Sequence, residues 1–445
     1  MDTPIKDFVD KYASSNAERL HMPGHKGVSN LGVEALDITE IDGADSLYTA
    51  NGVIKKSQEN ASSIFNAHTF YSTEGSSLSI RAMLYLALKH SNNNQDAFVL
   101  AGRNAHKSFI SAVGLLGLDV KWLYPKKSQN YLSCNIDAYD VEKTLSNLKQ
   151  LPIALYLTSP DYLGNTLDIQ SIKKVCNKFG VLLLVDNAHG SYLKFLPKSL
   201  HPIDLGADMC CDSAHKTLSA LTGAGYLHLS KSLPDNLVEL APTALSLFGS
   251  TSPSYLILQS LDLANKSLAD GYAKSLNEFI IQLDAFKEYL QSIGWTIVGD
   301  EKLKLSISTK EYGYYGYQVN EYLKSQNIIL EFYDKDFIVA MFTPNNGKRA
   351  IDNLKKALSS LPKKQAIKEP SPVFECPEKV LTIRQALLSE TEKIDVDNAD
   401  GKIFADVCFS CPPAVPVVVC GERINKKAIE CLKYYGVTEC SVVKE

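Results

Sequence analysis

Short apolar runs alternate with amphipathic stretches between residues 70 and 230 of this 445-residue chain. The apolar runs cover residues 98–101, 153–158, 181–185 and 226–229. Helical periodicity separates them, most clearly over residues 76–89 and 169–179. Continuous apolar strands that alternate with helices are typical of a mostly parallel sheet with both faces covered. Because ligands of such sheets bind beyond the carboxyl ends of the strands, we expect a site there.

The pattern changes after residue 250 and predicts further parts of the chain. A long helical stretch is expected over residues 253–293, followed by strands at 303–308, 328–333 and 337–342 and helices near 317–325 and 347–361. Residues 361–372 are rich in proline and charge and predict a linker. We therefore expect an N-terminal segment (1–70), a large domain (71–270), a small α/β domain (271–362), a linker (363–378) and a C-terminal α/β domain (379–445).

Composition narrows the class of protein. Apolar residues make up 45% and charged residues 22% of the chain, which indicates a globular protein. The formal net charge of −4 offers no electrostatic footprint for nucleic acid or an anionic membrane. No apolar run approaches the roughly 18 residues that span a bilayer, and the charged start lacks an apolar signal core. We expect a cytoplasmic protein.

The cysteines and histidines are unevenly distributed. Ten cysteines without a signal peptide are expected to be reduced thiols. Cys408 and Cys411 have the spacing of half a zinc site, and Cys420 could add a third thiolate. No second pair of this kind follows and no histidine occurs after His228, so we expect no metal site. All nine histidines lie in the first 228 residues, which is where acid–base or cofactor chemistry is expected.

One lysine-containing motif carries the strongest chemical signal. Ser213-Ala-His-Lys216 follows a short strand and precedes the small-residue loop at residues 222–225. This setting is typical of a lysine that forms a Schiff base with pyridoxal phosphate (PLP), with a hydroxyl nearby for the phosphate. Taken alone, the segment is as consistent with a surface lysine in a loop.

An acidic residue thirty positions earlier supports the cofactor interpretation. The apolar strand at residues 181–185 leads into Asp186, and an ionised aspartate there would keep the PLP ring nitrogen protonated. Ala188 is small enough to let the ring pack closely. A strand-terminal aspartate alone more often caps a helix or a turn. Its coincidence with the Lys216 motif favours the cofactor.

Two further segments fit the same cofactor. Gly75, Ser76 and Ser77 open the amphipathic helix at 76–89, where free N–H groups and hydroxyls suit a phosphate, although a plain helix cap would look similar. His106 directly follows the strand at 98–101, so its imidazole could lie flat on the pyridine ring.

With these motifs in this order, the chain resembles the ornithine/lysine/arginine decarboxylase family of fold-type I PLP enzymes, most closely its short Gram-positive form without an N-terminal wing domain. Further matching segments are residues 21–27 (HMPGHKG), 37–47 (DITEIDGADSL), 52–55 (GVIK), 58–59 (QE), 250–255 (STSPSY), 412–416 (PPAVP) and 421–424 (GERI). Residues 290–370 match only by pattern.

The resemblance implies a PLP-dependent transferase-like large domain of fold type I and the α-decarboxylation of lysine, arginine or ornithine to an amine and CO2, as in polyamine biosynthesis. It also implies a homodimer or a higher assembly of dimers. The implied roles are Schiff-base lysine for Lys216, pyridinium partner for Asp186, stacking for His106 and phosphate binding for Ser76, Ser77 and Ser213. His215 would contact the phosphate or act on Cα, His189 would lie near the phenolic oxygen or the substrate, and Thr251 or Ser252 would reach the neighbouring subunit's phosphate.

Some positions depart from the family pattern or stay open. Glu74 stands where asparagine is commoner, Cys420 where proline is usual and Cys411 where tyrosine is commoner. Candidates for holding the distal cation of the substrate are Asp42, Asp45 and Glu422, each equally consistent with an ordinary loop carboxylate. The alternatives are an aminotransferase or aldolase of the same fold type, or a catalytically silent PLP-binding regulator.

Overall fold

The structure is a computed structural model that describes residues 1–91, 96–124, 130–372, 375–407 and 415–444. It divides into two compact units. Unit 1 comprises Met1–Gln95 and Cys176–Ser275, and unit 2 comprises Asp96–Val175 and Leu276–Glu445. Two helices, α6 (Ile169–Phe179) and α11 (Tyr272–Ser292), cross from one unit to the other along the chain.

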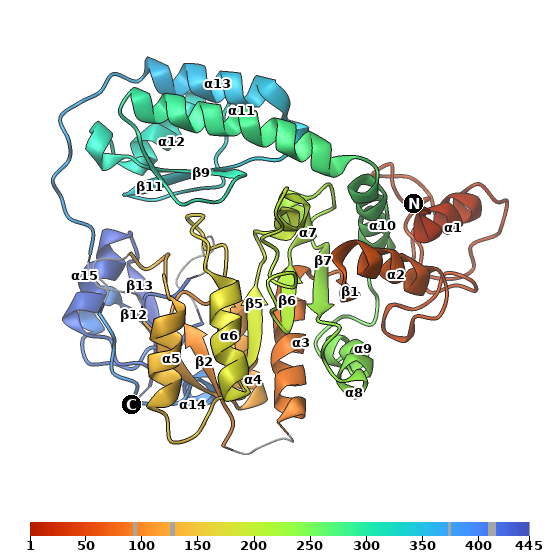
Figure 1. The fold of residues 1–445 in the computed structure, drawn as a ribbon, viewed down its shortest axis with the longest axis horizontal. Helices are drawn as coiled ribbons and strands as arrows, with labels where there is room; N and C mark the ends of the chain where they lie inside the picture. Colours follow the sequence, from red (N-terminus) through yellow and green to blue (C-terminus); the bar gives the residue numbers. More distant parts are fainter. Residues whose placement is uncertain (92–95, 125–129, 373–374, 408–414, 445) are drawn as a thin grey trace. The chain divides into compact units, whose positions relative to one another are not determined.

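Unit 1 is built on four strands in the order β1 (His68–Ser72), β7 (Gly225–Leu229), β6 (Met209–Asp212) and β5 (Leu182–Asp186). β5 and β6 are parallel, whereas β7 is antiparallel to both β6 and β1. Every residue of β6 and β7 is buried, which explains why these strands have continuous apolar runs rather than alternation. The long helix α3 (Gly75–His90) packs against this sheet (Figure 1).

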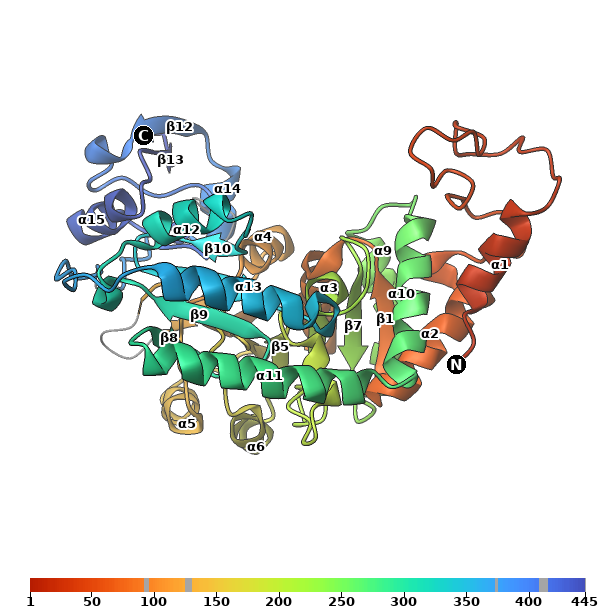
Figure 2. The ribbon, with the colours of Figure 1, turned by 90° about the horizontal axis from the view of Figure 1, so that it is seen from above.

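Among the remaining helices of unit 1, α1 (Pro4–Ala13), α2 (Val53–Phe65) and α10 (Tyr255–Ala269) pack on one another, and α2 also packs on β1. Figure 2 shows α1, α2 and α10 side by side. The shorter elements are η1 (Leu47–Thr49), η2 (Ser191–Phe195), α7 (Ala214–Thr217), α8 (Asp235–Glu239) and α9 (Ala241–Ser246). Between α1 and η1 the chain has neither helix nor strand and loops away from α1 (Figure 2).

Unit 2 has a parallel sheet in the order β4 (Ala154–Thr158), β2 (Phe98–Gly102) and β3 (Asp119–Leu123). Helices α4 (Lys107–Leu116) and α5 (Ala138–Ser146) follow β2 and β3 along the chain. Across the described residues of both units, these seven strands pair mostly in parallel and alternate with helices. The predicted α/β fold with a mostly parallel large-domain sheet is therefore confirmed.

A second sheet of unit 2 is antiparallel, with the order β10 (Phe332–Tyr333), β11 (Phe337–Met341), β9 (Lys304–Ser308) and β8 (Thr296–Val298). Its helices are α11, α12 (Gly316–Ser325) and α13 (Gly347–Ser360), and the short turns are η3 (Lys310–Tyr312) and η4 (Pro344–Asn346). α11 and α13 lie over β9 (Figures 1 and 2). The strand predicted at 328–333 shortens to the two residues of β10.

The C-terminal part of unit 2 has its own small core. Its elements are α14 (Ile383–Leu388), β12 (Thr391–Asp395), η5 (Val396–Asn398), α15 (Lys426–Tyr434) and β13 (Glu439–Val443), with β12 and β13 antiparallel. Phe404, Ile424 and Val442 are buried in this core together with Cys431 and Cys440. These two cysteines are therefore explained by packing. Residues 361–372, which predict a linker, contain neither helix nor strand.

The helix predicted over residues 253–293 is two helices, α10 and α11. The break falls at Asp270 and Gly271, and Gly271 has a φ of +95°. Glycine adopts this left-handed conformation without steric cost, and a residue in this conformation ends a right-handed helix. Apolar periodicity continues through the break, so the pattern did not predict it.

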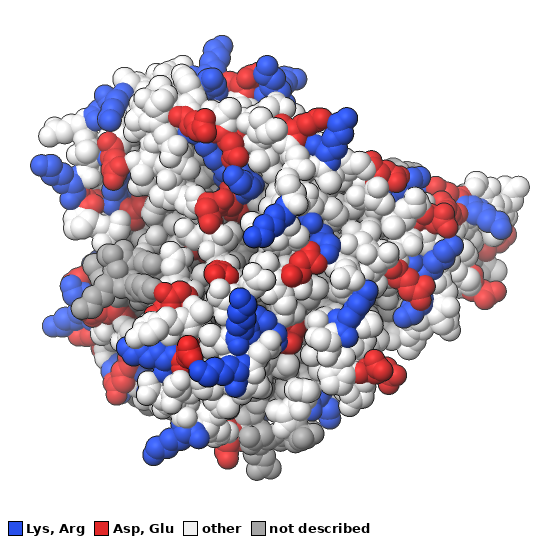
Figure 3. Space-filling view, viewed as in Figure 1, with Lys and Arg blue, Asp and Glu red and all other residues white. Residues whose placement is uncertain are grey.

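The charged side chains form no single-sign field on the face drawn in Figure 3, where lysine and arginine are interspersed with aspartate and glutamate. Among the described residues, no helix combines the length and the apolar character needed to cross a bilayer.

Candidate active site

The start of α3 forms a candidate anion site directly after β1. Gly75 opens the helix with a φ of +64° and donates its N–H to the Gly223 carbonyl at 2.7 Å. Ser76 and Ser77 follow in the first turn, where N–H groups have no intrahelical carbonyl to bond. The positive end of a sixteen-residue helix, with two hydroxyl side chains beside it, suits a phosphate group.

Two glycines let a neighbouring loop approach this helix start. A Cβ on Gly225 would lie 2.9 Å from the Gly75 carbonyl carbon, and one on Gly223 would lie 2.8 Å from the Thr73 carbonyl oxygen. Gly223 also has a φ of +97°. Larger residues would push the loop away from α3, so the small-residue loop predicted from the sequence has a steric reason.

The Lys216 amine lies against an imidazole from another turn. Lys216 is in α7, which follows β6, and His189 lies in the turn after β5. Their Nζ and Nε2 atoms are 3.0 Å apart. Because β5 and β6 are parallel neighbours, the turns at their carboxyl ends meet at one edge of the sheet. The structure thus brings together two of the predicted site residues.

The carboxylate of Asp186 lies at this same edge, at the carboxyl end of β5. Only 3% of the residue is exposed. Its Oδ1 accepts the N–H of Ala188 at 3.1 Å and lies 3.6 Å from the Cys211 thiol. Ser213, between β6 and α7, donates its hydroxyl to Ser76 Oγ at 2.9 Å, which joins the lysine turn to the start of α3.

His215 is held in a defined orientation between these segments. Its Nδ1 lies 2.8 Å from the Ala224 carbonyl, so Nδ1 carries the proton that is donated there. Burial, together with the nearby Lys216 charge, lowers the pKa of His215 below its ordinary value of 6.5. A neutral ring in this tautomer offers an Nε2 lone pair, which suits a proton acceptor better than a phosphate ligand.

His106 belongs to unit 2, whereas the other predicted cofactor residues belong to unit 1. It is the N-cap of α4, and its Nδ1 accepts the N–H of Ser108 at 3.2 Å and lies 2.9 Å from the Ser108 hydroxyl. Its stacking role stays a prediction.

The hydroxyl cluster at residues 250–252 lies beside the start of α3 in its own chain. The Ser250 N–H donates to Glu74 Oε1 at 2.7 Å, while Thr251 and Ser252 are exposed. The sequence places a helix start near residue 253, but α10 begins at Tyr255 with Ser254 as its N-cap. The cluster is therefore a loop before the cap, and its predicted contact across a dimer stays a prediction.

The three carboxylates considered for the distal cation differ in their surroundings. Asp45 accepts backbone N–H groups at the start of α2, including those of Gly52 at 2.8 Å and Ile54 at 3.0 Å, so it serves as a helix cap. Glu422 is 3% exposed and bonds the Arg103 guanidinium at 3.0 Å. Asp42 is exposed.

The Arg103 side chain joins the end of β2 to the C-terminal part of unit 2. Besides Glu422, it donates to the carbonyls of Pro416 at 2.9 Å and Val417 at 3.1 Å. Sequence reasoning considered Glu422 only as a partner for the substrate cation and missed this buried ion pair.

Cys408 and Cys411 lie outside the described residues. Cys420 is buried, and its thiol lies 3.3 Å from the Ala405 carbonyl. Burial raises the pKa of this thiol to about 12.

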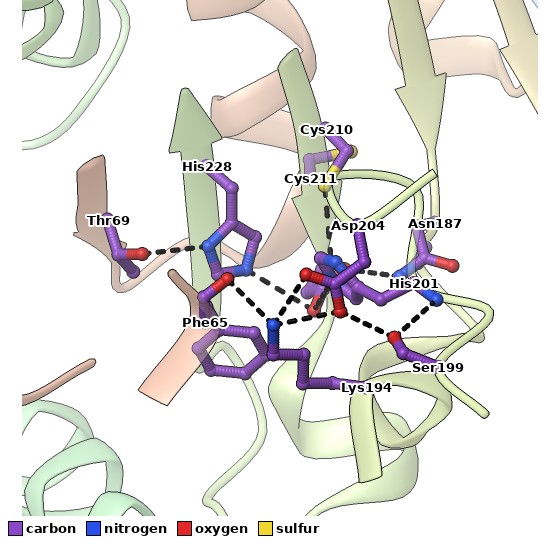
Figure 4. Close-up of polar contacts among 12 residues, drawn as sticks. Phe65, Thr69, Asn187, Lys194, Ser199, His201, Asp204, Cys210, Cys211 and His228 are labelled. Carbon is purple, nitrogen blue, oxygen red and sulfur yellow. Dashed lines mark hydrogen bonds and ion pairs between the residues drawn. The ribbon is translucent and has the colours of Figure 1, made fainter. Parts of the chain in front are cut away.

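Sequence reasoning also missed a buried polar network around Asp212, which is the residue directly before the Ser213-to-Lys216 turn. Its carboxylate bonds Asn187, His201 and His228, and these three partners are labelled in Figure 4. The position of Asp212 next to the Ser213-to-Lys216 turn was the only signal available in the sequence, because His201 and His228 are 27 positions apart.

A mostly parallel α/β sheet, with a lysine, an aspartate and a candidate anion-binding helix start at the carboxyl ends of its strands, is typical of the fold type I class of PLP-dependent enzymes. The comparisons with known proteins agree. A family model for the Orn/Lys/Arg decarboxylase major domain matches residues 3–298, and a model for the C-terminal domain of the same family matches residues 363–442. The chain belongs to the Orn/Lys/Arg decarboxylase family, whose members are PLP-dependent decarboxylases of basic amino acids.

Two relatives that match this chain over more than nine tenths of their own length are named arginine decarboxylase. The chain is 32% identical over 459 residues to an arginine decarboxylase from Halalkalibacterium halodurans, which covers 95% of this chain and 91% of the relative. It is 30% identical over 463 residues to an arginine decarboxylase from Bacillus subtilis, which covers 96% and 92%. The solved lysine decarboxylase of Francisella novicida has the same fold, with a TM-score of 0.80 at 16% identity over 99% of this chain and 81% of that one.

Proposed function

We propose that this protein decarboxylates a basic L-amino acid, with L-arginine as the first substrate to test, and releases CO2 and the corresponding amine. The proposal rests on the 3.0 Å contact between Lys216 Nζ and His189 Nε2, beside the buried Asp186. Relatives of similar length named arginine decarboxylase support arginine ahead of lysine and ornithine.

The residues of unit 1 fit PLP by their chemistry. Lys216 is a partly buried amine, and Asp186 is a nearly buried carboxylate on a neighbouring turn. Gly75, Ser76 and Ser213 combine a helix start with hydroxyl groups, which a phosphate dianion requires. Ser77 completes this first turn. The small side chain of Ala188 leaves room for a flat ring beside Asp186.

PLP, when bound, supplies an aldehyde for an amine and an electron-accepting ring that stabilises the charge left at Cα as a bond there breaks. Lys216 would attach the cofactor covalently through Nζ. Asp186 would hold a proton on the ring nitrogen, since a buried carboxylate favours a cation beside it. His189, in contact with Lys216, would take or give a proton at that amine.

Specificity for decarboxylation depends on holding the substrate carboxylate out of the ring plane, and for a basic substrate on a partner for its distal cation. Asp45 caps α2 and Glu422 bonds Arg103, so both carboxylates already have partners. This leaves Asp42 as the first of the three to test. The stacking of His106 and the homodimer stay predictions of the family resemblance.

The test is a product analysis with PLP-loaded protein. L-Arginine, L-lysine, L-ornithine and the apolar control L-leucine are each incubated with and without a keto acid, and amines, CO2 and new amino acids are measured by mass spectrometry. The proposal expects an amine and CO2 from one basic amino acid, independent of the keto acid. A new amino acid formed only with the keto acid would indicate an aminotransferase. A cofactor absorbance band without any turnover would indicate a silent regulator.

A further inference from the structure

A fully buried carboxylate lies behind the candidate active site, in unit 1. Asp212 ends β6 with 0% exposure. Its Oδ1 accepts the side-chain N–H of Asn187 at 2.6 Å, and its Oδ2 lies 3.2 Å from His201 Nε2 and 3.3 Å from His228 Nε2 (Figure 4). His228 in turn bonds Thr69 through Nδ1 at 2.9 Å. We call these five residues the Asp212 cluster.

The Asp212 cluster joins every strand of the unit 1 sheet. Thr69 is on β1, His228 on β7 and Asp212 on β6, while Asn187 directly follows β5. His201 comes from the loop after η2. Burying an ionised carboxylate without partners would cost a large desolvation free energy, and hydrogen bonds from the three donors offset this cost. Although burial raises it, the two histidines hold the pKa of Asp212 well below its ordinary value.

The protons in the cluster have a consistent arrangement. His228 accepts the Thr69 hydroxyl proton at Nδ1 and donates from Nε2 to Asp212. Burial lowers the pKa of His228, which fits this neutral tautomer. Asp212 therefore acts only as an acceptor toward three donors. An asparagine at this position would present an NH2 group to at least one of them.

Asn187 carries the influence of Asp212 into the turn after β5. Its N–H donates to the Cys211 carbonyl at 3.0 Å, and its carbonyl accepts the Gly190 N–H at 2.8 Å. A Cβ on Gly190 would lie only 2.0 Å from Asn187 Oδ1, so the turn closes tightly on this side chain. The same turn carries Asp186 at one end and His189 at the other.

We propose that Asp212 is a positioning residue for the active site. Through Asn187 it fixes the turn that carries Asp186 and His189, and through its own backbone it fixes the start of the turn that carries Lys216. One buried anion thereby sets the spacing of the three groups. This inference rests on the proposed function for the roles of Asp186, His189 and Lys216.

A metal ion is the competing explanation for part of this cluster. His201, Cys210 and Asp212 place one ligand-type atom each within 4.8 Å of one another, all in buried residues. The Asp212 carboxylate already accepts hydrogen bonds from Asn187, His201 and His228, so no cation is needed to satisfy it. The proposal therefore assigns protons, not a metal, to this cluster.

The experiment compares Asp212→Asn with Asp262→Asn. Asp262 is a matched control, because it is also a 0%-exposed aspartate of unit 1 with buried hydrogen bonds, to the Ser57 hydroxyl at 2.5 Å and the Ile5 N–H at 3.0 Å. Those bonds join α10 to α1 and α2 and do not involve the two turns. Both variants should lower the melting temperature of the cofactor-free protein. Only Asp212→Asn should also lower kcat at least ten-fold with KM changed less than three-fold, and halve the visible circular dichroism of bound PLP.

A second pair of variants keeps the test decisive if Asp212→Asn does not fold. Asn187→Ala removes one donor and leaves both histidines on Asp212, so it should show the same kcat and dichroism changes in milder form. Asn187→Ser, whose hydroxyl can still donate, should recover part of them. If the double variant Asp212→Asn/Asn187→Ala folds, its loss of kcat should be smaller than the two single losses combined, since both substitutions act through one hydrogen bond.

Three results would overturn the proposal. The first is wild-type kcat, KM and dichroism in Asp212→Asn and Asn187→Ala despite a lower melting temperature. The second is an equal loss of kcat in Asp262→Asn. The third is one equivalent of bound zinc that is lost in Cys210→Ser. Failure of the proposed function is separate, because the wild-type protein would then lack substrate turnover or the cofactor band would survive Lys216→Ala.

Discussion

The Nζ atom of Lys216 lies 3.0 Å from Nε2 of His189. This contact joins the turns after two neighbouring parallel strands, β6 and β5. An amine held by an imidazole in a partly buried site can pass a proton without releasing it to solvent. The contact also fixes where a covalently attached cofactor would begin.

Lys216→Ala should abolish the visible absorbance band of PLP-loaded protein and lower turnover by several orders of magnitude, because covalent attachment is lost. Lys231→Ala is the matched control, since Lys231 is an exposed lysine that bonds Asn66 at 2.8 Å on the surface of the same unit. Absorbance and product formation are measured on both variants, with far-ultraviolet dichroism to verify folding. An active Lys216→Ala protein would contradict the assignment.

Asp186→Asn should still bind PLP, because the groups that hold its phosphate are unchanged. It should lose about 100-fold or more in kcat, because the ring nitrogen loses its charged partner. Asp208→Asn is the control. Asp208 is 6% exposed and accepts the Leu183 N–H at 2.7 Å, where β5 begins rather than ends. Steady-state kinetics and cofactor titration distinguish the two. A near-normal kcat in Asp186→Asn would mean that the ring nitrogen lies elsewhere.

Glu74→Gln should tighten PLP binding about three- to ten-fold, since removing one negative charge near a phosphate is worth about 1 kcal/mol in a solvated site. The amide oxygen of glutamine can still accept the Ser250 N–H that Glu74 Oε1 accepts at 2.7 Å. Glu239→Gln, at the exposed end of α8, should leave the dissociation constant unchanged. Fluorescence titration measures both. Weaker binding in Glu74→Gln would show that the carboxylate helps to form the site.

If each active site is shared between two subunits, inactive variants should complement one another. Lys216→Ala subunits are mixed with subunits in which Thr251 and Ser252 are alanine. Half of the randomly formed dimers would then be mixed, with one working site of two, so about a quarter of wild-type activity should return. No recovery after verified subunit exchange would contradict the shared site. Full activity in a dilute monomer would contradict it as well.

The buried carboxyl group of Asp334, in unit 2, should make the free energy of unfolding depend on pH. Burial raises the pKa of its carboxyl from 3.8 to about 7, and its Oδ1 accepts the N–H groups of Asp336 and Phe337 at 2.7 Å. A raised pKa in the folded state means that its contribution to stability is full below pH 3.8 and is lost as the pH rises to about 7.

Asp334→Asn cannot ionise and should therefore gain stability relative to wild type between pH 5 and pH 8, by up to about 3 kcal/mol at about 1.4 kcal/mol per pKa unit. Urea unfolding at the two pH values measures the gain. Asp352→Asn, at an exposed position on α13, should show no such difference. An equal effect of pH on wild type and Asp334→Asn would contradict the raised pKa.

The sequence predicted those parts of the fold and of the candidate site that depend on neighbouring residues in the chain. The run 181–185 and its aspartate predicted β5, and the glycine and serines at 75–77 predicted the start of α3. The Asp212 cluster could not be predicted, because it depends on β7 lying between β1 and β6, and its histidines are ordinary core residues by sequence. Gly271 ends α10 through its φ alone, which apolar periodicity does not report.

Arg103 and Glu422 are 319 residues apart in the chain, yet they form one buried ion pair. At about 5–20 residues per second, a ribosome needs roughly 15–65 s to make the second partner after the first. During that time the turn before His106 holds a guanidinium whose buried position has no carboxylate to receive it. Arg103 therefore gains its carboxylate partner only when synthesis is nearly complete, and a chain terminated before Glu422 would lack this ion pair at the end of β2.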